Sequence, residues 1–147
     1  MNASTDKHRS KMHGETMIRH NFLIGALLMI NTVAMASATG DAETILQILL
    51  NTPQLSQYYH FDVRPQRKPL QINNHTHITI NPKAVVVDGE AIQIASGPNA
   101  LDITEFLVET ERAQIAFAFP VEGIRGSAIF NKDKNDWRLN HINVAEH

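Results

Sequence analysis

The sequence predicts an α+β domain in which one N-terminal helix packs on a long antiparallel β-meander. Residues 41–51 place their apolar side chains at helical spacing, whereas from Leu70 onward apolar and polar side chains alternate along short segments. A sheet built from such segments is apolar on one side only, and that side needs a second layer to cover it. The helix is the segment that we expect to do so.

Four apolar residues form the stripe that predicts this helix: Ile45, Leu46, Leu49 and Leu50. Asp41 is available as its N-cap. Thr52 and Pro53 then repeat the start signal of a cap followed by proline, which predicts another turn or two over residues 53–59. The connector at residues 64–69 contains two prolines and cannot continue a helix.

The strands are predicted from apolar alternation at residues 70–73, 76–81, 84–87, 90–95, 103–110, 113–120, 123–131 and 137–144. Asp88 and Gly89 predict a tight hairpin turn between two of these segments. Four aromatic side chains are spaced to share the apolar side of the sheet, and we expect them in the core: Phe117, Phe119, Phe130 and Trp137.

Residues 17–38 have the features of a cleaved secretory signal peptide. Arg19 and His20 precede a twelve-residue apolar run at residues 22–33, and small residues follow at 34–38. The run is well short of the roughly 20 residues that a bilayer span needs, which favours cleavage over a retained anchor. Residues 39–147 would then be a single domain. Residues 1–16 are either a mis-called start or an extension without folded structure, and we favour the first.

Charge and cysteine content exclude several classes of function. Of the 13 Lys and Arg and 15 Asp and Glu, four and two fall in residues 1–38, which leaves nine against thirteen and a net charge of 4 negative for residues 39–147. This balance argues against binding to nucleic acid or to an anionic membrane surface. The chain contains no cysteine, so it has no disulfide and no thiolate nucleophile, which suits a bacterial periplasm better than a eukaryotic secretory route.

The C-terminal third carries a resemblance to a known family. Residues 119–128 (FPVEGIRGSA), 136–139 (DWRL) and 142–144 (INV) resemble a run found in cytochrome oxidase assembly factor 1 and its bacterial relatives. Residues 50–55 resemble the helix end that precedes the sheet in that family, whereas the segment from about 70 to 95 is extra, and the family usually keeps an N-terminal anchor. The resemblance implies a cystatin-like fold and a non-catalytic, partner-assisting role.

The junction of helix and sheet is where we expect a binding surface. It gathers tyrosine and arginine, which often anchor protein interfaces, in a locally basic stretch of an acidic chain. Guanidinium groups suit a carboxylate or phosphate, so the ligand would be anionic or an acidic patch of a partner. The alternative is that the connector is simply a solvated charged loop. The predicted binding residues are Tyr58, Tyr59, His60, Arg64, Arg67 and Lys68.

A metal site is the main alternative. His75 and His77 lie two apart on a candidate strand and would point the same way, with a further ligand from His60, His141 or a carboxylate. Two imidazoles do not define a metal geometry, so we favour the interpretation that these histidines lie on the solvent-exposed face of a strand, and no metal is predicted.

No catalytic motif is present. The serines lie outside any G-x-S-x-G or S-x-x-K pattern, and the glycines at 123 and 126 precede a strand, where they indicate turn chemistry or close strand packing. We therefore expect a small exported protein without enzymatic activity or cofactor. It would bind an unknown envelope protein in the periplasm or outside the cell, as an assembly aid, an inhibitor or an immunity-type partner. A metal-binding or small-ligand-binding module is the alternative.

Overall fold

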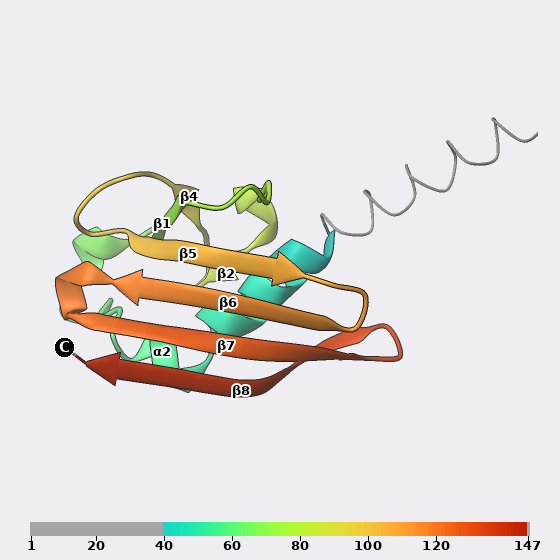
Figure 1. Cartoon of the computed structure of the whole chain (residues 1–147). Coiled ribbons are helices and arrows are strands. Elements are labelled where there is room, and N and C mark those ends of the chain that lie inside the picture. Colours follow the sequence, from blue (N-terminus) through green and yellow to red (C-terminus); the bar gives the residue numbers. More distant parts are fainter. Residues whose placement is uncertain (1–39, 147) are drawn as a thin grey trace, which may run out of the picture. The chain divides into compact units, whose positions relative to one another are not determined.

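The computed structural model describes residues 40–146, which form a helix packed against a mostly antiparallel sheet (Figure 1). Residues 40–50 are helical and the short helix α2 (Pro53–Ser56) follows. Three 3₁₀ turns are η1 (Pro65–Arg67), η2 (Pro82–Ala84) and η3 (Pro120–Glu122). The strands are β1 (Gln71–Asn74), β2 (Val86–Val87), β3 (Glu90–Ala91), β4 (Gln93–Ile94), β5 (Leu101–Val108), β6 (Arg112–Phe119), β7 (Ile124–Asp133) and β8 (Asp136–Glu146).

Six strands form the main sheet in the order β4, β1, β5, β6, β7, β8, and β2 and β3 form a separate hairpin. The last four strands are the predicted antiparallel meander, joined by short turns. β1 departs from the prediction, because it pairs in parallel with both β5 and β4. Parallel pairing requires a crossover, and here the residues between β1 and β5 provide it.

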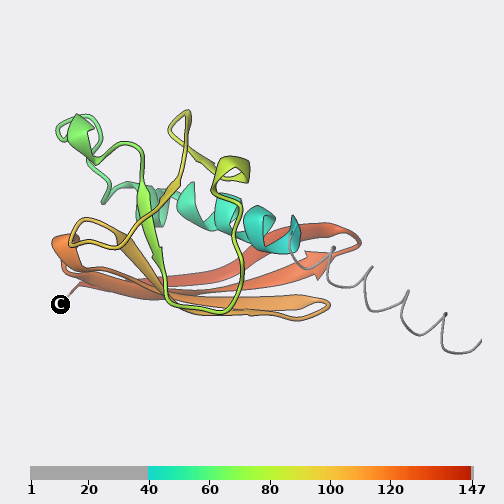
Figure 2. The ribbon, with the colours of Figure 1, turned by 90° about the horizontal axis from the view of Figure 1, so that it is seen from above.

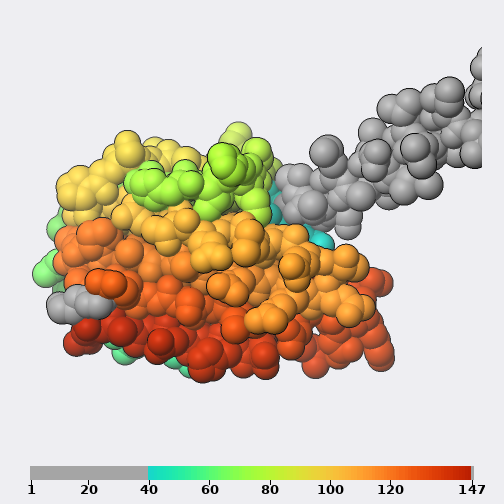
Figure 3. Space-filling model, viewed as in Figure 1, coloured from blue at the N-terminus to red at the C-terminus, as the bar shows by residue number. Residues whose placement is uncertain are grey.

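The first helix lies across one face of the sheet (Figure 2). Its apolar stripe is fully buried, as are the core positions of the meander, including the four predicted aromatic side chains. The opposite face carries polar and small side chains, for example Ala116, Ser127 and Asn143 in register on β6, β7 and β8. Figure 3 shows this outer face, where the side chains of β5 to β8 lie side by side without a covering helix. The expected two-layer α+β arrangement is confirmed.

Three polar side chains spaced four residues apart, two in the first helix and one just after its end, form hydrogen bonds with the chain before and within β2. The Glu43 carboxylate accepts a hydrogen bond from the Asn81 backbone N–H at 2.7 Å. The Gln47 amide donates to the Val86 carbonyl at 2.8 Å and accepts from the Val86 N–H at 2.7 Å, so it pairs with β2 as a strand would. Asn51 adds a third bond, to the same carbonyl. The 70–95 segment is therefore fixed to the helix as well as to the sheet.

Three of the predicted strands differ in the structure. The strand predicted at residues 84–87 is shortened to β2 at residues 86–87, because Ala84 belongs to η2. Residues 76–81 form no strand, because the Asn74 side chain accepts from the Thr76 N–H and hydroxyl at 3.1 and 2.8 Å and turns the chain at the end of β1. The segment 90–95 is divided into β3 and β4 at Ile92, whose N–H donates to the Val85 carbonyl, whereas the next two residues form β4 and pair with β1. The Asp88-Gly89 hairpin is present, with both residues at positive φ (49° and 84°).

The helix starts also differ in detail. Residue 40 is already helical, so Asp41 is not the N-cap; its carboxylate instead accepts hydrogen bonds from Lys132 Nζ at 2.9 and 3.1 Å. Thr52 precedes α2 as predicted, but its hydroxyl donates to the Leu49 carbonyl rather than capping α2.

The glycines at 123 and 126 have the expected structural roles of turn chemistry and close strand packing, although Gly126 lies within β7 rather than before it. Gly123 ends η3 in the left-handed conformation (φ 64°). A Cβ on Gly126 would overlap the Asn143 carbonyl oxygen and lie 2.5 Å from Cζ of Phe117, so glycine alone leaves room for the aromatic ring.

The predicted extension at residues 1–16 and leader at residues 17–38 lie outside the described residues. Within residues 40–146, no helix is both long enough and apolar enough to cross a membrane.

Candidate functional site

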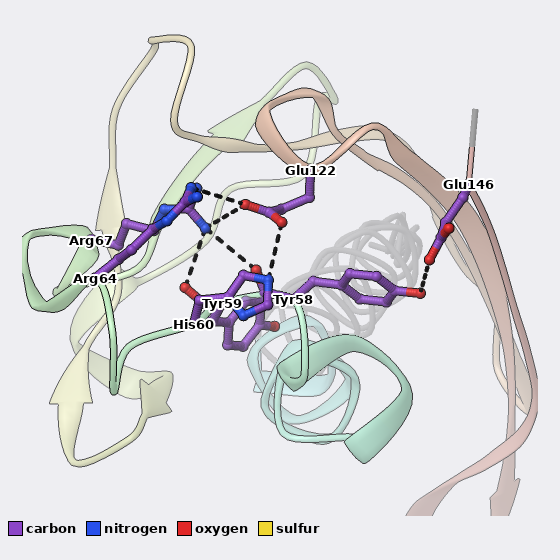
Figure 4. A network of polar contacts seen from close by, with 7 residues as sticks. All are labelled: Tyr58, Tyr59, His60, Arg64, Arg67, Glu122 and Glu146. Carbon is purple, nitrogen blue, oxygen red and sulfur yellow. Dashed lines mark hydrogen bonds and ion pairs between the residues drawn. The ribbon is translucent and has the colours of Figure 1, made fainter.

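Three of the six predicted binding residues converge on a single carboxylate, that of Glu122 (Figure 4). His60, Arg64 and Arg67 come from the connector between α2 and β1, whereas Glu122 comes from η3, between β6 and β7. The side chains of the other three predicted residues make their contacts elsewhere.

Local backbone geometry aims the connector side chains at Glu122. His60 has a left-handed backbone (φ 54°), which histidine tolerates better than most residues. Its carbonyl accepts from the Val63 and Arg64 N–H groups at 3.1 and 2.7 Å, and the Arg67 N–H bonds in turn to the Arg64 carbonyl at 3.0 Å. These consecutive turns place the imidazole and both guanidinium groups on the same side of the connector.

The Glu122 carboxylate is contacted on both oxygens. His60 Nε2 lies 3.1 Å from Oε2, whereas Arg67 Nη1 lies 2.6 Å and Arg64 Nη1 lies 3.6 Å from Oε1. Oε1 is buried, and Arg67 Nη1 is its closest cationic contact. Burial by itself raises the pKa of the Glu122 carboxyl, but the contact with Arg67 and the neighbouring charges outweigh burial and hold the pKa below its ordinary value of 4.5.

Arg64 and Arg67 differ sharply in exposure. The Arg64 side chain is 50% exposed, whereas that of Arg67 is only 7% exposed. Arg67 also reaches the Tyr58 and Tyr59 carbonyls at 3.5 and 3.4 Å and lies over the Phe119 ring. Arg67 is therefore part of the packed structure, contrary to a uniformly solvated connector, and Arg64 is the guanidinium that solvent or a ligand can reach.

The two tyrosines point away from the cluster. Tyr59 is buried, donates from its hydroxyl to the Leu50 carbonyl at 2.9 Å and packs edge-on against Phe119, and burial raises the pKa of its phenol. Tyr58 is partly buried and bonds through its hydroxyl to Glu146 at 3.2 Å, near the end of β8. Of the two, only Tyr58 retains an exposed part.

Lys68 joins the connector to the β2–β3 hairpin. Its ammonium pairs with the Asp88 carboxylate and lies over the Phe61 ring, and the hydrogen bond to Asp88 raises the pKa of Lys68. Lys68 therefore has a partner within the chain.

The histidines of the predicted metal alternative are exposed. His75 Nε2 lies 3.1 Å from Asp102 Oδ1, and the Asn73 amide bonds to the same oxygen at 2.8 Å. His60 belongs to the Glu122 cluster instead. In the part of the chain that the structure describes, no group of three or more His, Asp or Glu side chains is placed to hold a metal ion.

Glu122 was not among the predicted site residues. Its partners are more than 50 positions away in the sequence, so no local spacing connects them. The available signal was that Glu122 is the only acidic residue between Arg112 and Lys132, next to a glycine that ends a turn. Glu122 also lies within residues 119–128, the run that resembles the assembly-factor family, but the resemblance implies no role for this side chain.

No family model, curated protein or solved structure matches this chain.

The lowered pKa of Glu122 predicts an acid-sensitive contribution to stability. This contribution is fully present above the unfolded pKa of about 4.5 and is lost as the pH falls through the lower folded value. Unfolding by denaturant at pH 7 and at pH 3 should therefore show a smaller loss of stability on acidification in Glu122→Gln than in wild type. Glu111→Gln, at an exposed loop carboxylate, is the matched control and should keep the wild-type pH dependence. An identical pH dependence in wild type and Glu122→Gln would contradict the prediction.

Proposed function

We propose that this chain is a small exported, non-enzymatic protein-binding domain of a bacterial envelope, acting as an assembly aid, an inhibitor or an immunity-type partner. Its fold would be of the cystatin-like kind. The helix lying across one face of a four-stranded antiparallel meander supports this proposal, and so does the resemblance of residues 119–144 to cytochrome oxidase assembly factor 1 and its relatives.

The single observation that carries the proposal is the surface around Arg64. The backbone that carries this half-exposed guanidinium is held by consecutive turns, so the connector loses little backbone freedom when it binds. Val63 next to it is 69% exposed, and Val121 on η3 is also exposed and lines a pocket together with Arg64. An accessible arginine flanked by exposed apolar side chains has the composition of a protein interface rather than of ordinary solvated surface.

Affinity capture from the envelope fraction of the source cell tests the proposal. Wild type should retain a specific protein, and Arg64→Ala should weaken its retention by about tenfold or more, as expected for an arginine at the centre of an interface. Arg138→Ala is the matched control, because Arg138 is an exposed arginine on β8 that lies 3.6 Å from the Asp133 carboxylate, the same distance as that between Arg64 and Glu122. Equal retention by wild type and Arg64→Ala would place the interface elsewhere. Loss of retention in a His75→Ala, His77→Ala variant alone would favour the metal-binding alternative.

Export has its own test. N-terminal sequencing of the protein from the envelope fraction should find a start after Ala36 or Ala38, because both alanines complete the small-residue spacing of a signal peptidase site. Recovery of a chain that still contains residues 22–33 would contradict cleavage and favour an anchor.

A further inference from the structure

A pocket of about 230 Å³ lies beside the Glu122 cluster and is rich in hydrogen-bond donors. Its walls come from the connector, from β1, from the loop before β5 and from η3, so segments far apart in the sequence meet there. Six residues line it: Arg64, Gln66, Arg67, Gln71, Asn99 and Val121. Two of these carry guanidinium groups and three carry amides, each of which can donate through N–H.

Among residues 40–146, the charges around this pocket are not balanced. Arg67 is matched by Glu122 at 2.6 Å, whereas Arg64 has only the 3.6 Å contact with the same carboxylate. Two guanidinium groups therefore share one negative charge, and the pocket keeps an excess of one positive charge before His60 is counted. Because Arg67 is paired with the largely buried Glu122 carboxylate, the excess positive charge lies on Arg64.

We propose that this pocket binds a carboxylate group, presented by an acidic side chain of the protein partner. A planar carboxylate fits the fork of a guanidinium, and the amides of Gln71 and Asn99, which also line the pocket, offer further donors. The excess of one positive charge matches a monoanion better than a phosphate, which carries more negative charge at neutral pH. The inference that the carboxylate comes from an acidic side chain rests on the proposed protein-binding function. The inference that the pocket binds a carboxylate does not.

Nuclear magnetic resonance of the purified full chain labelled with ¹⁵N tests the proposal without a partner. Adding N-acetylglutamate amide, which models an acidic side chain, should produce saturable shifts of the Asn99 and Gln71 side-chain amide signals. N-acetylglutamine amide has the same shape without the charge and should produce none. Arg64→Gln should weaken the binding by about tenfold or more, whereas Arg138→Gln should leave it unchanged. Spectra of both variants that match wild type away from the pocket would establish that they remain folded.

Three results would overturn the carboxylate site: equal shifts with the neutral analogue, equal affinity in Arg64→Gln, or tighter binding of inorganic phosphate than of the carboxylate. The capture experiment separates this proposal from the previous one. If the carboxylate binds through Arg64 but no protein is retained, the pocket stands and the protein-binding function fails. If retention depends on Arg64 but no carboxylate binds, the function stands and the pocket proposal fails.

Discussion

Phe117→Ala should lower the free energy of unfolding by about 3 to 5 kcal/mol, the range found when a large aromatic side chain is removed from a packed core. Phe117 lies in the middle of β6, is 2% exposed and packs against Gly126 on β7, where even one added carbon would meet its ring. Such tight packing leaves little room for neighbours to fill the cavity. A domain of this size is typically stable by only about 5 to 15 kcal/mol, so the loss would be a large part of the total.

Equilibrium unfolding in urea measures this effect through the shift of the transition midpoint. Leu107→Ala is the matched control, because Leu107 lies on β5 but its side chain is 55% exposed on the outer face. It should change stability by no more than about 0.5 kcal/mol. Similar midpoint shifts for the two variants would contradict the assignment of Phe117 to the core.

The sequence was sufficient for the parts of the fold that depend on local pattern. Apolar alternation predicted all four strands of the meander to within about two residues at every end, and the helical stripe and the Asp88-Gly89 turn were also predicted correctly. The failures lie at β1 and in the 70–95 segment. There, the Asn74 side chain ends β1, and contacts with the first helix and with β5 determine which strands pair. The spacing of apolar residues along the sequence carries no information about these contacts.

The candidate site shows the same division. Its basic and aromatic residues could be selected from the sequence because they are adjacent, but their separate roles could not. Tyr59 and Lys68 were grouped with Arg64, yet one is buried in the core and the other pairs with Asp88. Arg64 and Arg67 instead contact Glu122, which η3 brings to the connector from more than 50 residues away in the sequence. Long-range charge pairing of this kind requires the fold.

Arg67 therefore differs in consequence from Arg64, although the two are three residues apart on the same turn. Removing Arg64 takes away a half-exposed cation with a long ion contact, which should alter stability little. Removing Arg67 leaves the largely buried Glu122 carboxylate without its closest cation and opens space over Phe119. A buried charge that loses its partner is among the costliest changes in a folded chain.

Arg67→Ala should accordingly destabilise the protein by about 2 to 4 kcal/mol at pH 7, below the full cost of a completely buried pair because Glu122 is 13% exposed and keeps His60 and Arg64 nearby. Arg64→Ala should cost no more than about 1 kcal/mol. Urea unfolding of both variants and of the double variant Arg67→Ala, Glu122→Gln measures the coupling. Because glutamine removes the unpaired charge, the double variant should recover part of the loss. If Arg67→Ala unfolds at the wild-type midpoint, or if the double variant is no more stable than Arg67→Ala alone, then the ion pair does not hold the connector to η3.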